Sequence, residues 1–297
     1  MSAVLITGAS RGIGRATALH LAAAGWDVLA GVRDADAGKE LAAESSRITP
    51  IDLDVTNPAQ LANLDELLPE RLDAVVNNAG IAIGGPIEAV ALNDLRWQFE
   101  VNVVGQIAVT QAVLPRLRES RGRVVLISSL NGRVSIPMSA AYNASKFAIE
   151  ALADALRVEL RPWGIRVILI EPGCIDTDPW RRMMDLLDEV ADGMRPEHHG
   201  LYSAHLAGQR KIIARLQQQT RPAALVASAI ERALTSKRPR SRQLVGLDAR
   251  ALVAMRAALP TRALDAIWAR GMGVAATGGA VGSRAGRRER GSGARPG

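Results

Sequence analysis

Residues 3–22, AVLITGASRGIGRATALHLA, contain a short apolar run, three glycines spaced GxxxGxG and then an uninterrupted helical pattern. A strand, a glycine turn and a helix in this order are typical of the first unit of a doubly wound α/β sheet. Glycine lets the chain turn sharply and lets the backbone approach a phosphate, while the helix start offers unpaired N–H groups and a partial positive charge. We therefore expect the turn at residues 7–14 to bind a phosphate-bearing ligand.

The rest of the chain repeats this alternation of strand and helix. Six further apolar runs lie near residues 26–32, 48–53, 72–77, 122–128, 164–170 and 241–246, with helical patterns between them. This alternation favours parallel strands joined by helices. With 297 residues, 48% of them hydrophobic, the chain can bury a substantial core. We predict a single-domain α/β Rossmann fold, with a doubly wound parallel sheet of about seven strands flanked by helices and ligands at the carboxyl ends of the strands.

A phenol and an ammonium group lie four residues apart at Tyr142 and Lys146, thirteen residues after Ser129. Residues 140–160 contain no Pro or Gly, so we expect a long helix with both head groups on one face. A phenol exchanges protons poorly at neutral pH, and a nearby cation lowers its pKa toward the working range. The pair alone is equally compatible with two residues on an ordinary helix surface. Ser129 and the upstream glycine turn make it a candidate catalytic site.

Further motifs follow the predicted strands. They are Asp54-Val55, Asn77-Asn78-Ala79-Gly80, Asn102 within a helix predicted at residues 92–117, and Pro172-Gly173-Cys174-Ile175-Asp176-Thr177. Together with the glycine turn, Ser129, Tyr142 and Lys146, these motifs resemble the short-chain dehydrogenase/reductase family over roughly residues 3–177. The chain as a whole is similar to the hydroxysteroid and retinol dehydrogenase branch of that family. Each motif taken singly is compatible with an ordinary turn or helix cap, and their joint order is what indicates the family.

The resemblance implies an oxidoreductase that transfers hydride between a nicotinamide and a carbonyl or alcohol carbon. Tyr142 would be the general acid or base, and Ser129 would hold the reacting oxygen beside it. Lys146 would lower the pKa of the phenol and bind the nicotinamide ribose, and Asn102 would hold a water. The implied cofactor-binding residues are Gly8, Ser10, Arg11, Gly12, Ile13, Gly14, Arg33, Asp54, Val55, Asn78, Ala79, Gly80, Tyr142, Lys146, Pro172, Gly173, Ile175 and Thr177. The alternative is a nucleotide-binding regulator of the same fold without turnover.

The end of the second predicted strand indicates which cofactor is bound. An NAD enzyme of this fold normally carries an acidic residue there to bind the ribose 2′-hydroxyl, and the family resemblance assigns that position to Val32. Arg33 follows, and Arg11 lies in the glycine turn, so two guanidinium groups can flank a 2′-phosphate. We expect NADP(H). Asp34 leaves an alternative open, because a shift of the loop would bring a carboxylate to the ribose.

Residues 178–219 follow the Pro-Gly motif and are predicted to form a lid over the substrate. Apolar residues recur there at helical spacing, namely Trp180, Met183, Met184, Leu187, Val190 and Ala191. An amphipathic helix of this kind suggests a hydrophobic ketone or alcohol substrate, since flexible methionines suit a tolerant pocket. Packing of the same face on the protein body explains the pattern equally well.

The formal net charge is +7, but its distribution argues against a nucleic-acid partner. Residues 272–297 carry five arginines against Glu289, a local charge of +4 that leaves +3 for the rest. This stretch is rich in Gly and Arg and has almost no bulky apolar side chains, so we expect a disordered tail beyond a catalytic domain at residues 1–271. Arg exceeds Lys by 33 to 4 over the whole chain, which weakens the case for a specific binding patch.

The remaining patterns concern location and assembly. The first strand begins by residue 3 and no run of 18 apolar residues occurs, so we expect a cytoplasmic protein. The single cysteine, Cys174, excludes an internal disulfide, and the four histidines lack the partners of a metal site.

An amphipathic segment at residues 249–270, interrupted by Pro260, fits either a membrane surface or a subunit neighbour. We favour the neighbour and expect a homodimer or homotetramer.

Overall fold

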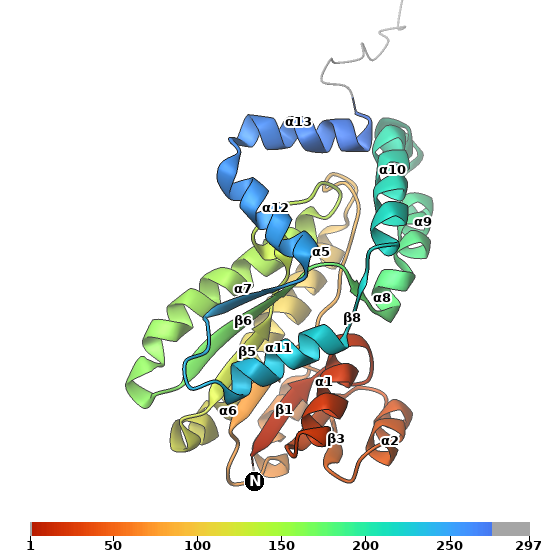
Figure 1. The fold of residues 1–297 in the computed structure, drawn as a ribbon. Helices are drawn as coiled ribbons and strands as arrows, with labels where there is room; N and C mark the ends of the chain where they lie inside the picture. Colours follow the sequence, from red (N-terminus) through yellow and green to blue (C-terminus); the bar gives the residue numbers. More distant parts are fainter. Residues whose placement is uncertain (1, 275–297) are drawn as a thin grey trace, which may run out of the picture.

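The computed structural model describes residues 2–274. Its centre is a seven-stranded sheet in the order β3-β2-β1-β4-β5-β6-β9, in which all neighbouring strands are parallel (Figure 1). The strands are β1 (Ala3–Thr7), β2 (Asp27–Val32), β3 (Ile48–Asp52), β4 (Ala74–Asn77), β5 (Arg123–Ile127), β6 (Arg166–Pro172) and β9 (Arg242–Val245). This architecture confirms the predicted doubly wound Rossmann fold.

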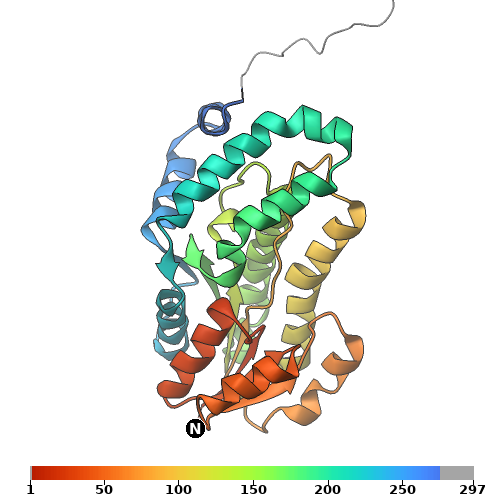
Figure 2. The same cartoon turned by 90° about the vertical axis from the view of Figure 1, so that its right-hand side faces the viewer.

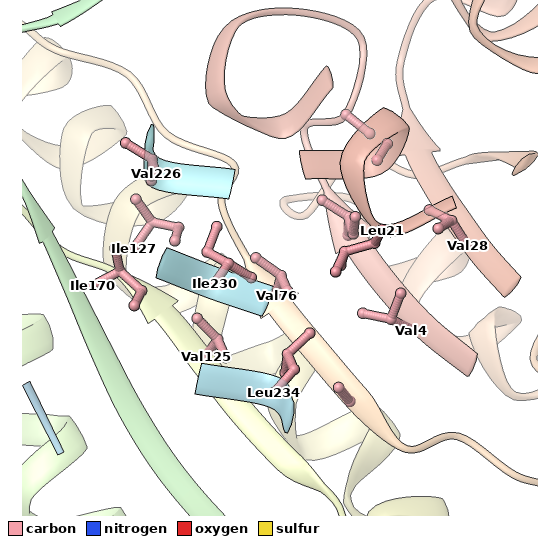
Figure 3. Packing of buried hydrophobic residues seen from close by; sticks show 14 of the residues in the cluster. Val4, Leu21, Val28, Val76, Val125, Ile127, Ile170, Val226, Ile230 and Leu234 are labelled. Atoms are coloured by element: carbon pink, nitrogen blue, oxygen red, sulfur yellow. The ribbon is translucent and has the colours of Figure 1, made fainter. Parts of the chain in front are cut away.

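One face of the sheet is covered by α1 (Gly12–Ala23), α2 (Ala35–Ala43) and α11 (Ala224–Thr235). Figure 3 shows this layer, in which Leu21 and Ile230 from the helices pack against strand residues such as Val4 and Val76. All four of these side chains are fully buried. Burial of an aliphatic side chain of this size contributes about 1.5–3 kcal/mol relative to exposure.

The other face is covered mainly by α6 (Gly105–Ser120) and α7 (Ala140–Glu159). Alternate strand residues face the two layers, so Val4 packs on the first face and Leu5 on the second. Because both faces are buried, each strand reads as a continuous apolar run instead of an alternating one. The short helices α3 (Pro58–Ala62) and α4 (Leu64–Leu67) lie beside α6.

The helix predicted at residues 92–117 differs from expectation in its middle. It comprises α5 (Leu92–Phe99), a π-helical segment at Glu100–Val104 and α6. The chain stays helical throughout, but the hydrogen-bond register widens for one turn, and Asn102 lies within that turn. Such π turns occur mostly as single insertions, frequently at functional sites.

The predicted lid at residues 178–219 is helical, as α8 (Asp178–Arg181), α9 (Met183–Gly193) and α10 (Pro196–Gln217). The small strands β7 (Ile175–Asp176) and β8 (Arg221–Pro222) pair at its base. Two helices follow β9, namely α12 (Leu247–Ala258) and α13 (Thr261–Met272). Figures 1 and 2 show α9, α10 and α13 at the end of the molecule farthest from the chain's start.

The apolar face of α9 packs on neighbouring elements. Leu187 and Ala191 join a cluster with Leu206 of α10, Met272 of α13 and Met138, which precedes α7. Helices α9, α10 and α13 therefore share a small core of their own. Met183 and Met184 lie at the margin of this cluster and are only partly buried.

The end of the packed chain lies beyond the boundary predicted at residue 271. Met272 ends α13 and is 3% exposed, and Val274 packs against the cluster that α9 forms. A Cβ atom on Gly208 would collide with the carbonyl oxygen of Met272, so α10 and the end of α13 are in close contact. The rest of the predicted tail, residues 275–297, lies outside the described residues.

The amphipathic segment at residues 249–270 is divided between α12 and α13, and Pro260 stands at the N-cap of α13. Leu264 is buried, whereas Ile267 is 42% exposed. Within residues 2–274, the helices are too short or too polar to cross a lipid bilayer.

Candidate active site

The glycine turn connects β1 to α1 through two residues in the left-handed region, Gly8 at φ 65° and Gly12 at φ 56°. A Cβ atom on Gly14 would collide with the carbonyl oxygen of Gly8, so the first turn of α1 lies directly against the loop. Arg11 is the N-cap residue of α1, and its side chain does not cap the helix. The N–H groups at the start of α1 thus face a cradle that suits a pyrophosphate. This fit supports a dinucleotide cofactor.

The Asn77–Gly80 motif holds the glycine turn in place. The side-chain amide of Asn78 donates to the carbonyl oxygens of Thr7, at 2.9 Å, and Gly8, at 3.1 Å. In return, the hydroxyl of Thr7 accepts from the backbone N–H groups of Asn78 and Ala79, both at 3.0 Å. Asn78 therefore shapes the cradle through its side chain.

The Pro172–Thr177 motif reaches the same place from the other half of the sheet. A Cβ atom on Gly12 would lie 3.4 Å from the Thr177 methyl group, so the two motifs are in contact. Asp248 of α12 accepts a hydrogen bond from the backbone N–H of Cys174 at 2.7 Å, and its carboxylate fills the space where a Cβ atom on Gly173 would lie. Asp248 was not anticipated from the sequence, because it is 74 residues away from Cys174.

The predicted catalytic side chains converge where β5 ends. Tyr142 and Lys146 share a face of α7, and the Lys146 ammonium nitrogen lies 5.6 Å from the centre of the Tyr142 ring. Ser129 follows β5 and lies near Tyr142, close enough for its side chain to influence the pKa of the phenol. The Ser129 side-chain oxygen accepts from the Asn131 N–H at 3.1 Å. Lys146 is buried and donates to the Ile127 carbonyl oxygen at 2.8 Å, which fixes its head group beside the strand end.

Burial determines the proton affinities of this pair. It raises the pKa of Tyr142 above its usual value of 10, and the hydrogen bond from Ser129 offsets only part of that rise. The sequence predicts that Lys146 lowers the pKa of Tyr142. In the structure this pKa is raised instead. Burial also lowers the pKa of Lys146 to about 8, against an opposing effect of Glu150. Lys146 thus carries a proton that it can exchange close to neutral pH.

Asn102 links three parts of the site from its position in the π-helical segment. Its side-chain oxygen accepts from the backbone N–H of Ile81 at 2.8 Å. Its amide donates to the Ile81 carbonyl oxygen at 2.9 Å and to the Ser145 hydroxyl on α7 at 3.1 Å. Gln98, one turn earlier, bonds the Ile81 carbonyl and the Ile83 N–H in the same way.

Gln98 and Ser145 are buried polar residues of the site that the sequence analysis missed. The available signal was the spacing of Gln98 and Asn102, which places two amides on one helix face. Their shared target, the loop around Ile81, directly follows the Asn77–Gly80 motif. Both amides therefore support the loop that closes the site next to the glycine turn.

At the end of β2, Val32 is buried and Arg33 is exposed. An Arg33 guanidinium nitrogen lies 3.7 Å from a carboxylate oxygen of Asp54. Asp34 caps α2 by accepting from the N–H groups of Asp36, at 3.0 Å, and Ala37, at 3.4 Å. The Asp34 carboxylate is thus engaged in the helix start. Val55 lies against Gly105, where α6 begins.

The arrangement provides a cradle for phosphates, two neighbouring hydroxyl groups, and a buried ammonium beside them. A carbonyl oxygen placed between Ser129 and Tyr142 would receive two hydrogen bonds, which stabilise negative charge on that oxygen. The Tyr142 phenol can then supply a proton. These are the requirements of acid-catalysed reduction and of the reverse oxidation.

Comparison with known proteins identifies the family. The family model described as short chain dehydrogenase matches residues 2–185. Estradiol 17-beta-dehydrogenase 2 of Mus musculus is 34% identical over 288 residues, which cover 91% of this chain and 74% of the relative. Retinol dehydrogenase 16 of Homo sapiens is 35% identical over 275 residues, which cover 89% of this chain and 86% of the relative.

Solved structures show the same fold. A short chain dehydrogenase from Burkholderia cenocepacia in complex with NADP superimposes with a TM-score of 0.71 at 26% identity, covering 90% of this chain and 97% of that one. A short chain dehydrogenase/reductase from Burkholderia phymatum in complex with NAD gives 0.71 at 25% identity, covering 86% and 92%. This chain therefore belongs to the short-chain dehydrogenase family and is an oxidoreductase of that family.

Proposed function

We propose that this protein interconverts a hydrophobic ketone and its alcohol with NADP(H), using Tyr142 as the general acid or base. The observation that carries the proposal is the proximity of Tyr142 to Ser129 and to the buried ammonium of Lys146. The nicotinamide, when bound, gives or takes the hydride. The protein's own residues bind the substrate oxygen and move its proton.

Each catalytic side chain has a distinct role in this proposal. Ser129 donates a hydrogen bond to the reacting oxygen and holds it near Tyr142, which gives the proton in reduction and takes it in oxidation. Lys146, with a pKa of about 8, reprotonates Tyr142 and binds the cofactor's ribose. Asn102 keeps Ile81 and Ser145 in place and holds a water that links Lys146 to solvent.

The preference for NADP(H) rests on the end of β2. The buried Val32 offers no acceptor to a ribose hydroxyl, and Arg33 follows it with an exposed guanidinium. The Asp34 carboxylate is occupied at the start of α2, which argues against the alternative in which it binds the ribose. Arg11 and the exposed Arg33, whose guanidinium lies 3.7 Å from Asp54, can meet a 2′-phosphate with charge-assisted bonds.

The substrate proposal rests on the lid. The partly buried Met183 and Met184 lie on α9 at the margin of an apolar cluster, and methionine adapts to varied apolar shapes. The relatives named for estradiol and retinol are dehydrogenases of apolar alcohols. A hydrophobic ketone or alcohol is therefore the class of substrate that we propose.

We also propose a homodimer or homotetramer, located in the cytoplasm. Large apolar side chains are exposed along α5, the π-helical segment and α7, among them Trp97 at 44%, Val104 at 50% and Phe147 at 44%. Clusters of this kind mark protein interfaces. The alternative function, a regulator without turnover, is disfavoured because Asn102, Ser129, Tyr142 and Lys146 are all present.

The proposal is tested by following NADPH oxidation at 340 nm with a panel of aliphatic, aromatic and polycyclic ketones, and NADP reduction with the matching alcohols. The Tyr142→Phe variant keeps the ring but loses the hydroxyl, so its turnover should fall by about 10²–10⁴-fold. Its NADPH affinity and melting temperature should match those of the wild type. NADPH binding without turnover of any panel compound would favour the regulator.

A further inference from the structure

Arginines gather around the edge strand of the sheet, in a region that neither the glycine turn nor Tyr142 lines. A cavity of about 940 Å³ lies along β9, bordered by α11, the connection at residues 236–241 and α12. Figure 1 shows β9 between α11 and α12. We call it the β9 cavity, and its arginines are Arg133, Arg232, Arg238, Arg240, Arg242 and Arg250.

The share of arginine among the lining residues is higher than its share of the whole chain. Six of the 16 residues that line the β9 cavity are arginines, against 33 in the 297 residues of the chain. Glu171 is the single carboxylate among the described lining residues. The cavity wall therefore carries a large excess of positive charge.

Two of the six arginines lie beside carboxyl groups of the protein. Arg242 pairs with Glu150 at 2.9 Å and with Asp154 at 2.7 Å, and Arg133 lies 3.3 Å from Glu171. The other four, Arg232, Arg238, Arg240 and Arg250, are exposed and form no ion pair within residues 2–274. Their charges are therefore not balanced by a carboxylate of residues 2–274.

Glu171 contributes little negative charge to balance these four arginines. Its side chain is fully buried, and one of its carboxylate oxygens has no hydrogen-bond partner among the described residues. Burial, together with the nearby Glu150, raises the pKa of Glu171 to about 7 against the opposing arginines. Near neutral pH this carboxyl group is therefore partly protonated.

The shape of the site matters as much as its charge. Arg232 comes from α11, Arg238 and Arg240 from the connection before β9, and Arg250 from α12. Arginines that line one cavity from three segments suit a tetrahedral phosphoryl group, whose oxygens point in several directions, better than a planar carboxylate. A concave wall also concentrates the positive potential.

We propose that the β9 cavity binds a soluble small molecule with two or more phosphoryl groups, at a site separate from the cofactor site. Four unpaired guanidinium groups match the charge of two phosphoryl groups, each of about −1.5 to −2 at pH 7. The glycine turn and Tyr142 do not line this cavity, so both sites can be occupied together.

Pyrophosphate is the probe that tests the site. The full chain is titrated with pyrophosphate by isothermal calorimetry at low salt, once alone and once with saturating NADPH, which blocks the phosphate cradle of α1. The Arg238→Gln/Arg240→Gln variant should weaken the NADPH-independent binding by about tenfold or more, since two charge-assisted contacts are lost. Inorganic phosphate should bind more weakly than pyrophosphate.

The matched control is Arg256→Gln/Arg262→Gln, which removes two exposed arginines outside the cavity and should keep pyrophosphate affinity within about twofold. Circular dichroism checks that both variants are folded. Three results would overturn the proposal: complete loss of the titration when NADPH is present, equal weakening in the two double variants, or inorganic phosphate binding as tightly as pyrophosphate. If the protein does not bind NADPH, the comparison of the variants without it still decides the question.

Discussion

The side-chain amide of Asn102 donates a hydrogen bond to the Ser145 hydroxyl at 3.1 Å, and both residues are fully buried. This bond joins the π-helical segment to α7, the helix that carries Tyr142 and Lys146. The same Asn102 side chain bonds the backbone of Ile81 twice. Asn102 is therefore a structural link between three segments of the site as well as a candidate catalytic residue.

The first prediction concerns this link. Asn102→Ala leaves the Ile81 N–H without its partner, so the free energy of unfolding should fall by about 1–3 kcal/mol. Ser145→Ala removes one bond to Asn102 and leaves the Ile81 contacts intact, so its loss should be smaller, about 1 kcal/mol or less. Urea unfolding of both variants measures the difference. Equal losses would show that the Ile81 contacts contribute nothing.

The local elements of this protein could be predicted from the sequence, because each strand and the glycine turn is specified by neighbouring residues. Val4 and Leu5 are apolar on both faces of β1, and Gly8 and Gly12 adopt the left-handed backbone that glycine permits. The π-helical turn could not be predicted in this way. Its sequence around Asn102 is compatible with an ordinary helix, and the widened register accompanies contacts with a loop about 20 residues earlier.

The electrostatics of the site were also beyond sequence reasoning. The spacing of Tyr142 and Lys146 predicts that the head groups are neighbours, and they are. It does not reveal how deeply each group is buried, and burial is what raises the pKa of Tyr142 and lowers that of Lys146. Contacts such as Asp248 with Cys174 depend on how distant segments pack.

The second prediction follows from the buried ammonium of Lys146, whose pKa falls from 10.5 to about 8. Between these values the unfolded chain keeps the proton and the folded protein releases it, so this residue adds stability as the pH rises. From pH 8 to pH 10 the wild type should gain about 2 kcal/mol relative to Lys146→Met, since each unit of pKa shift corresponds to about 1.4 kcal/mol. Denaturant unfolding of the cofactor-free proteins at both pH values measures it. If the difference in free energy of unfolding between the wild type and Lys146→Met were the same at pH 8 and pH 10, Lys146 would have an ordinary pKa in the folded protein.

The third prediction places the end of the packed domain. A chain that stops after Val274 should melt at the same temperature as the full chain. A chain that stops after Gly271 lacks the buried Met272, which packs against α10 at Gly208, and should melt several degrees lower. Calorimetry of the three proteins distinguishes the two boundaries. If the chain that stops after Val274 melted at a lower temperature than the full chain, residues 275–297 would contribute to stability.

The last prediction concerns cofactor preference, and it depends on Val32 and Arg33. If Arg33 binds the 2′-phosphate, Arg33→Leu should weaken NADPH binding by about tenfold, the low end for a charge-assisted contact because the side chain is exposed. Adding Val32→Asp supplies an acceptor for the ribose hydroxyl and repels the phosphate, so the double variant should prefer NADH.

Asp34→Ala is the matched control: it removes the cap of α2 and should lower stability while the cofactor preference stays unchanged. Fluorescence titration of each protein with both cofactors gives the ratio directly. A wild type that binds NADH as tightly as NADPH, with a preference that moves in Asp34→Ala, would place the discriminating residue at Asp34, two positions beyond Val32.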